Sequence, residues 1–363
     1  MRQEGHLQVF DLILKTKGPV FIGCGRSYTK KEYIFDLEPN SNRVSFVDEL
    51  KFFTYLAEHG LADAYERYIL DSKHGNLGDF LKEDCKLSTA QIRSMIRCEM
   101  DAGNALDGGH ALKEIRRFIR DGNDRVYVPG SSIKGALRTV LLKAMLLENP
   151  PKNPDPERLY RKFDNFEQDY FHTLSLKKDH NQIVQVGNPL NSIMQGVRIS
   201  DSLPVPDSRL CLTPKIDVYA DGTYNQINIC RESIKPGTAI QCTITLDQSI
   251  LKGKLTRERI LQAVEQVSKY YQDTVLSHYP HVDNYMNSRT MLLGGGAGFQ
   301  SKTVTDPYYG ADALNITAEI LHRAFRNHYH DRDAAGGISP RALNQTDYNQ
   351  APYPYGVCEV FIQ

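Results

Sequence analysis

Apolar and polar positions along the chain follow two different periods, and together they predict a mixed α+β fold. Strand-like runs, alternating or continuously apolar, occupy residues 6–14, 126–128, 197–202, 211–220, 226–247 and 357–362. Apolar residues at helical spacing occupy residues 131–149, 257–275 and about 312–328, together with a block from about 47 to 120. The order strand, helical insertion, helix, strands, helix, strand predicts a ferredoxin-like β-α-β-β-α-β core with a large helical insertion.

Two segments in the first third carry sharper expectations. Residues 6–14 have apolar side chains on both sides of the predicted strand, so we expect other elements to cover both faces. The insertion is predicted to end in a helix at residues 110–120. Its apolar stripe is Leu112, Ile115, Phe118 and Ile119. Lysine and arginine side chains lie on the other side of that helix, as on many solvated faces.

The later segments divide the chain into two predicted halves. Residues 150–190 are polar and irregular, with a short helix near 157–170, and are typical of a linker. Residues 331–350 are predicted to form a polar loop. We therefore place an N-terminal half at 1–195 and a strand-rich C-terminal half at 196–363, with the helical insertion either a lobe of its own or part of the first fold.

Composition narrows the class of protein. The 44 Lys and Arg residues balance 44 Asp and Glu residues, so any site for a polyanion must be a local patch. Seven cysteines form no CxxC pair, which argues against a disulfide framework and against a zinc knuckle. We find no signal peptide and no apolar run of membrane-spanning length. The sequence predicts a soluble cytoplasmic protein that has no membrane partner, no metal and no cofactor.

The stretch VPGSSIKGALR, residues 128–138, carries the most specific local chemistry. Ser131 and Ser132 are placed to cap the helix that follows, yet Lys134 sits near its first turn and Arg138 lies one turn further on. Cations near the positive end of a helix are disfavoured unless an anion such as phosphate binds there. Gly130 and Gly135 would let that anion approach the backbone.

The charge balance around this motif supports the same interpretation. Residues 108–144 carry eight Lys and Arg residues against three acidic residues, a net charge of +5 in a neutral protein. An ordinary capped helix with surface charges would have the same spacing. A Walker phosphate-binding loop is excluded, because Ala136 and Leu137 stand where Lys and Ser or Thr are required.

VPGSSIKGALR resembles the signature of the RAMP proteins of type III CRISPR effector complexes. In that family the motif opens the first helix of an RRM-like fold and contacts CRISPR RNA. FIGCGRSYTK (21–30), GGGAGFQSK (294–302) and PYGVCEV (354–360) are similar to the family's glycine turn, its C-terminal glycine-rich loop and its closing strand. The length and the helical insertion are most similar to the subunit that caps the 3′ end of CRISPR RNA in type III-A (Csm) complexes.

The glycine run at 294–298 fits neither of the nucleotide-binding patterns. Phe299 and Ser301 stand where a Rossmann loop needs its third glycine. The Walker pattern fails because Ser301, and not glycine, precedes Lys302-Thr303. A bare backbone surface remains, on which RNA can lie while Phe299 stacks on a base and Lys302 meets a phosphate. The alternative is a flexible loop with Phe299 in the core.

The sequence contains no convincing catalytic constellation. His328, His330, Asp331 and Asp333 are the strongest cluster, but their spacing matches no known metal motif. The resemblance implies a non-catalytic subunit. One alternative is a stand-alone RAMP-fold endoribonuclease that processes CRISPR repeat RNA with a histidine, and another is a nucleotide-dependent enzyme that uses one of the glycine loops.

We therefore predict an RNA-binding subunit that holds the 3′ part of CRISPR RNA, caps the backbone filament and supports RNA maturation in antiviral defence. The resemblance implies as partners CRISPR RNA, target RNA, the adjacent RAMP backbone subunit, the small subunit and host nucleases for 3′ trimming. The predicted contact residues are Gly25, Arg26, Lys30, Lys31, Gly130, Ser131, Ser132, Lys134, Arg138, Gly294, Gly295, Gly296, Gly298, Phe299 and Lys302.

Overall fold

Strand β2 (Leu7–Thr16) lies inside the first of two six-stranded sheets, in the order β12-β15-β2-β11-β8, with β1 also paired to β2. The computed structural model describes all residues except 1, 72–74, 107–113, 156–166 and 178–183. The other strands of this sheet are β1 (Arg2–Glu4), β8 (Val197–Ile199), β11 (Ala239–Asp247), β12 (Thr290–Leu292) and β15 (Val357–Ile362). Every pairing is antiparallel. The four strands β15-β2-β11-β8 have the order expected of a ferredoxin-like core.

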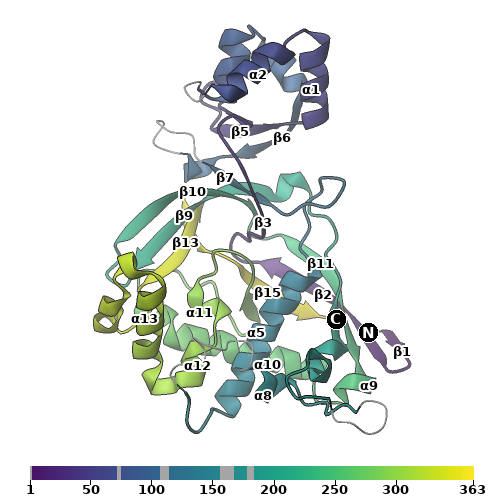
Figure 1. Ribbon diagram of the computed structural model, residues 1–363, viewed down its shortest axis with the longest axis vertical. Helices are drawn as coiled ribbons and strands as arrows, with labels where there is room; N and C mark the ends of the chain where they lie inside the picture. The colour runs from purple at the N-terminus through teal and green to yellow at the C-terminus, as the bar shows by residue number, and fades with distance from the viewer. Residues whose placement is uncertain (1, 72–74, 107–113, 156–166, 178–183) are drawn as a thin grey trace.

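Helices α5 (Gly130–Glu148) and α10 (Arg257–Thr274) pack side by side against this first sheet (Figure 1). On α5 an apolar stripe that includes Ile133, Leu137 and Val140 is buried, as its helical spacing predicts. Helix α10 begins where the Thr256 side chain accepts a hydrogen bond from the Arg259 N–H at 3.2 Å. The predicted α+β architecture with two core helices is confirmed.

The expectation that both faces of β2 are covered is wrong. Phe10, Leu12 and Leu14 on one face are buried, whereas Asp11 on the other face is exposed and Ile13 is half-buried. Successive side chains of a strand point to opposite faces. The helices therefore bury one row of residues and leave the other partly open.

The second sheet has the order β14-β13-β9-β10-β7-β3 and corrects two predicted segments. Its strands are β3 (Gly23–Tyr28), β7 (Ile115–Phe118), β9 (Leu210–Tyr219), β10 (Tyr224–Ile234), β13 (Ala342–Tyr348) and β14 (Ala351–Pro354). Strand β7 replaces the described part of the helix expected at 110–120, because it pairs parallel to β10 and antiparallel to β3. Strand β13 replaces part of the loop expected at 331–350, because it pairs with both β9 and β14. Long-range pairing overrides local periodicity in both places.

Both predicted halves of the chain contribute strands to both large sheets. Strand β2 lies between β11 and β15 from the C-terminal half, and β7 pairs with β10. One large hydrophobic cluster joins residues of the two halves. Residues 1–195 and 196–363 therefore share a core.

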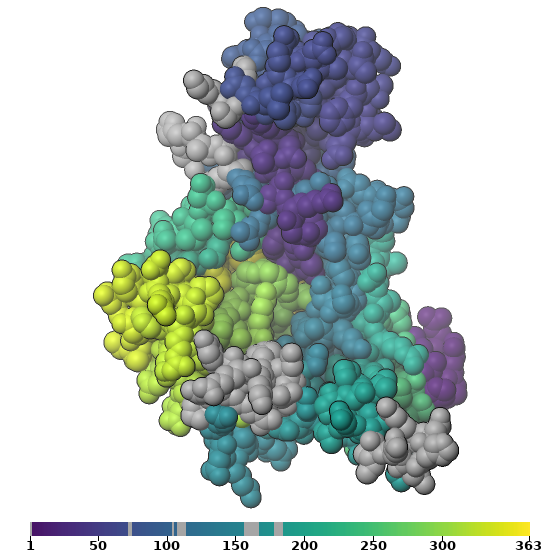
Figure 2. Space-filling view, in the orientation of Figure 1, coloured from purple at the N-terminus to yellow at the C-terminus, as the bar shows by residue number. Residues whose placement is uncertain are grey.

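The inserted segment forms a lobe with its own sheet and its own core. Its sheet has the order β4 (Tyr33–Phe35), β5 (Arg43–Val47), β6 (Ile96–Asp101), so its last strand lies where a helix was expected. Its helical elements are α1 (Glu49–Glu58), α2 (Ala62–Leu70), α3 (Leu77–Asp79), the π-helical turn η1 (Phe80–Asp84) and α4 (Thr89–Ser94). A separate cluster of buried apolar side chains, including Phe52, Leu56 and Ile92, holds these helices together. Figure 2 shows the lobe as an upper body joined to the rest by a narrower neck.

The remaining helical elements are short, apart from α13. They are η2 (Gly103–Ala105), α8 (Gln168–Phe171), η4 (Pro189–Asn191), η5 (Ile193–Gly196), η6 (Asp207–Arg209), α9 (Gln248–Leu251), η7 (Leu276–His278), α11 (Phe299–Lys302), α12 (Thr305–Tyr309), η8 (Gly310–Asp312), α13 (Ala313–Ala324), η9 (Arg326–His328) and η10 (His330–Gly336). Helix α8 lies at the end of the helix predicted near 157–170, most of which falls outside the described residues. The strand expected at 126–128 is reduced to isolated bridges from Val126 to Arg120 and Val205. Within the described ranges, no helix combines the length and apolar character needed to cross a membrane.

Candidate functional site

Helix α5 begins at Gly130, and its N-cap residue, Pro129, has no side chain that could cap the first turn. The prediction that Ser131 and Ser132 supply N-cap hydroxyls is wrong, because both lie inside that turn. At Gly130 the main chain approaches β8 so closely that a Cβ would lie 2.2 Å from the Ile199 carbonyl oxygen. The Gly130 N–H donates to Asp201 Oδ1 at 2.8 Å, so a carboxylate of the protein already occupies one donor of this positive helix end.

The outer side of α5 presents the polar residues of the motif as one strip. Ser131, Gly135 and Arg138 are exposed and Lys134 is half-buried. Residues three or four positions apart lie above one another on a helix, so these four face the same way. We call Ser131, Lys134, Gly135 and Arg138 the α5 strip.

The α5 strip carries positive charge that internal carboxylates neutralise only in part. Arg138 forms an ion pair with Glu167, and Arg198 on β8 pairs with Asp247 at 3.0 Å. Lys134 has no ion pair with a described residue, and burial, followed by the charges of Arg138 and Arg198, lowers its pKa. An anion bound at this position would offset both effects.

The glycine run at 294–298 is packed on one side and open on the other. A Cβ at Gly294 would lie 2.4 Å from the Phe21 carbonyl oxygen, and the Gly295 N–H donates to that oxygen at 2.6 Å. A Cβ at Gly298 would meet nothing within 4 Å. Gly298 therefore has open space beside it, while the first part of the run packs on the protein's own residues.

The two side chains predicted to act beside the glycine run both lie on α11. Phe299 is half-buried. It is neither fully exposed, as stacking on a base would favour, nor fully in the core, which was the alternative. Lys302 reaches solvent, and partial loss of hydration together with the charge of Arg231 lowers its pKa. The Lys302 side chain is therefore accessible to a partner.

The basic residues at positions 26–31, near the family's glycine turn, differ in their surroundings. Gly25, Arg26 and Lys30 are exposed, and Arg26 lines a cleft of about 710 Å³ between β3 and the inserted lobe. Lys31 instead donates three hydrogen bonds, to the carbonyl oxygens of Tyr68, Ile69 and Asp71. Three donors are all that an ammonium group has, so Lys31 caps the end of α2 and we drop it from the proposed contacts.

The structure places α11, which follows the glycine run, beside helix α5. Lys143 of α5 is buried and donates to the carbonyl oxygen of Gln300 on α11, and burial lowers the pKa of Lys143 to about 8. Because Gly294 also packs on Phe21, the run lies between α5 and the segment that leads into β3. Arg26 lies instead at the cleft beside the lobe.

Part of the net positive charge counted around the motif is neutralised inside the protein. Arg117 pairs with Asp124 at 3.5 Å, and Arg120 pairs with Glu232, Asp207 and Asp124. Arg125 pairs with Asp121, and Lys113 lies outside the described residues. The charge count from the sequence therefore overstates the charge available to a polyanion.

The histidine cluster near residue 330 is a structural anchor. Asp333 is fully buried and accepts hydrogen bonds from Ser339 Oγ at 2.9 Å and from Arg341 Nη1 at 3.1 Å. His330 Nδ1 lies 2.8 Å from the same carboxylate. A search of the described residues finds no group of His, Cys, Asp and Glu side chains that could hold a metal ion.

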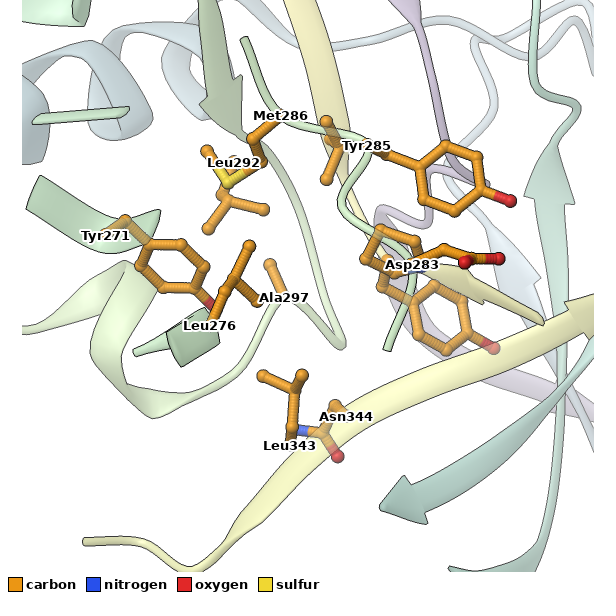
Figure 3. Close-up of a pocket in the computed structure, with 12 residues that line it drawn as sticks. Tyr271, Leu276, Asp283, Tyr285, Met286, Leu292, Ala297, Leu343 and Asn344 are labelled. Carbon is orange, nitrogen blue, oxygen red and sulfur yellow. The ribbon is translucent and has the colours of Figure 1, made fainter. Parts of the chain in front are cut away.

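The pocket behind Ala297, between Tyr271 and Leu343, measures only about 10 Å³, room for at most one water molecule (Figure 3).

Comparison with known proteins places this architecture in a family. The model of the RAMP superfamily matches residues 13–284. The chain belongs to the RAMP superfamily. The resemblance that VPGSSIKGALR carried is thereby confirmed.

This RAMP protein is similar over its whole length to proteins of CRISPR systems. It is 27% identical over 386 positions to the CRISPR system Cms protein Csm5 of Mycobacterium tuberculosis, covering 99% of this chain and 98% of the relative. It is also 27% identical to Csm5 of Streptococcus thermophilus, with 82% of this chain and 80% of the relative covered.

Two solved structures share the fold of this RAMP protein. One is a chain in the cryo-EM structure of a Csm–crRNA–target RNA ternary complex of a type III-A CRISPR-Cas system, with a TM-score of 0.66, 18% identity and coverage of 97% of this chain and 100% of that chain. The other is the crystal structure of T. onnurineus Csm5, with a TM-score of 0.55, 18% identity and coverage of 96% and 99%. The likeness in fold to these two structures thus covers nearly the whole chain.

Proposed function

We propose that this chain is a non-catalytic, RNA-binding subunit of a type III-A CRISPR interference complex. It binds the 3′ part of CRISPR RNA, caps the backbone filament and supports RNA maturation. The full-length similarity to Csm5, in sequence and in fold, carries the proposal. It also supports RNA and other Csm subunits as partners: CRISPR and target RNA, the adjacent RAMP backbone subunit, the small subunit and, for 3′ trimming, host nucleases.

The α5 strip suits contacts with the RNA backbone. Its side chains are hydroxyl, ammonium and guanidinium groups, which bind phosphate and carry no information on base identity. Asp201 already holds the Gly130 N–H, so side chains rather than the free helix end provide the contacts. Binding through them should be independent of spacer sequence.

Replacing Lys134 and Arg138 with alanine should weaken RNA binding by about tenfold, which corresponds to roughly 1.4 kcal/mol. If both side chains meet phosphates, the slope of log K against log salt should fall by about 1.4, at about 0.7 for each phosphate of a single strand. Fluorescence anisotropy with two labelled RNAs of unrelated sequence measures both quantities. Equal slopes for wild type and variant would contradict the proposed contact surface.

Two controls separate RNA contact from local folding. Glu167→Gln removes the ion pair of Arg138 but keeps the guanidinium, so RNA affinity should be maintained or rise. Lys269→Ala with Arg323→Ala removes the same charge from α10 and α13, where both residues form exposed ion pairs with acidic neighbours one turn away. That pair of changes should leave the salt slope unaltered.

Gly135→Ala should stabilise the protein and weaken RNA binding. A Cβ at this exposed helical position meets nothing within 4 Å, so alanine should add about 0.5–1 kcal/mol to the free energy of unfolding. Where RNA lies against the strip, the added methyl group displaces it. Chemical denaturation and anisotropy of the same sample test the two effects, and a variant that gains stability with unchanged affinity would place the RNA away from Gly135.

A further inference from the structure

Arg231 of β10 is a buried cation, and its residue is 6% exposed. Its Nε and Nη1 atoms have no hydrogen-bond partner in the part of the chain that the structure describes. Among the described residues none forms an ion pair with it. The neighbouring carboxylate, Glu232, belongs to the opposite face of the strand and pairs with Arg120.

Aromatic rings hold Arg231 in place without neutralising it. The guanidinium carbon lies 5.5 Å from the centre of the Phe21 ring and 4.8 Å from that of Tyr355. Such contacts attract a cation to the ring faces but leave its charge in place. A buried charge without a counter-ion is costly, so a site of this kind points to a ligand of opposite sign.

The glycine run lies directly over this cation. A Cβ at Gly296 would lie 2.7 Å from Arg231 Nη1 and 3.0 Å from the Tyr355 ring, so only glycine lets the main chain lie so close. The φ angle is positive at Gly294, Gly296 and Gly298, that is, at every second residue. Free main-chain N–H groups that lie close together in a loop can bind an anion. The N–H groups of residues 296–298 donate to no described residue.

We propose that Arg231, beneath the glycine run, is the residue that positions a phosphate group of the RNA on this run, with Lys302 beside it. This inference rests on the proposed function and adds to it a residue, Arg231, that no sequence motif singled out. Arg231 acts as a positioning residue, because Gly296 separates it from solvent. Its charge holds the phosphate against the main-chain N–H groups, while the Lys302 ammonium contacts it from the solvent side.

The test measures salt-dependent binding of a fluorescein-labelled single-stranded RNA to the full-length protein. Arg231→Met keeps much of the side-chain volume and removes the charge, and Lys302→Glu reverses a charge at the surface, where folding is not at risk. Each change should lower affinity, and Arg231→Met should reduce the salt slope by about 0.7. Arg257→Met, on α10, serves as the control for loss of an arginine and should leave the slope unaltered.

A double-mutant cycle decides whether the two cations share one phosphate. If they do, Lys302→Glu should weaken binding less in the Arg231→Met background than in the wild type. Additive losses, or an Arg231→Met variant with unchanged affinity and slope, would overturn the subsite. If Arg231→Met does not fold, full RNA affinity of Lys302→Glu overturns it as well. Wild-type protein that binds no RNA would instead refute the proposed function itself.

Discussion

Replacing Glu232 with glutamine should lower the free energy of unfolding by about 3 kcal/mol, which is the low end of the cost of breaking a buried ion pair. The Glu232 side chain is fully buried, pairs with Arg120 and accepts the Phe118 N–H at 2.9 Å. Glutamine keeps the volume but leaves the Arg120 guanidinium, whose side chain is 5% exposed, without its main counter-charge. Asp207 and Asp124, 3.4 and 3.8 Å from Arg120, still compensate in part.

Urea denaturation of Glu232→Gln beside Glu319→Gln provides the measurement. Glu319 forms an exposed ion pair with Arg323 on α13, and loss of such a pair costs about 0–1 kcal/mol. Equal destabilisation by the two changes would show that the buried ion pair stabilises the protein no more than an exposed one. The network also joins the lobe to the core, because Arg97 of β6 pairs with both Asp124 and Asp207.

Replacing Gly130 with alanine should destabilise the protein by about 1–3 kcal/mol, as overpacking of a well-packed contact does. The new Cβ would lie 2.2 Å from the Ile199 carbonyl oxygen and 2.7 Å from the Ser200 carbonyl carbon, and main-chain atoms cannot turn away as side chains do. The first turn of α5 must therefore shift from β8. That shift weakens the hydrogen bond to Asp201 and moves Lys134 relative to Arg198.

Gly135→Ala is the matched control, since it makes the same change in the same helix at a position with open space. Thermal unfolding should rank Gly135→Ala above the wild type and Gly130→Ala below it. RNA affinity should fall in both variants. Gly130→Ala displaces the α5 strip, whereas the methyl group of Gly135→Ala obstructs the RNA directly. A Gly130→Ala variant as stable as the wild type would show that the contact with β8 can relax.

The two glycines of the motif show what the local sequence can and cannot predict. Glycine at 130 and at 135 looks alike in the motif, and both were expected to admit an anion. Only the placement of β8 separates them, because Ile199 comes from a strand far along the chain. Arg198 of that strand was missed for the same reason, since its approach to Lys134 depends on how β8 lies beside α5.

The positive charge of residues 108–144 illustrates the same limit for electrostatics. A count of charges in a window includes Arg120 but leaves out two of its partners, Asp207 and Glu232, which lie far away in sequence. Coulomb attraction acts over a few ångströms of space, whatever the separation along the chain. A local sum therefore cannot tell a free patch from an internal network.

The sequence by itself determined the elements whose apolar pattern is clear within one segment: the amphipathic helices α5 and α10 and the apolar strands β2, β11 and β15. It also determined the family, through a motif of consecutive residues. Tertiary structure alone decided that residues 115–118 and 342–348 form strands, because their hydrogen bonds go to distant segments. It likewise decided which cations remain available to RNA, since burial and ion pairing depend on neighbours that only the folded chain brings together.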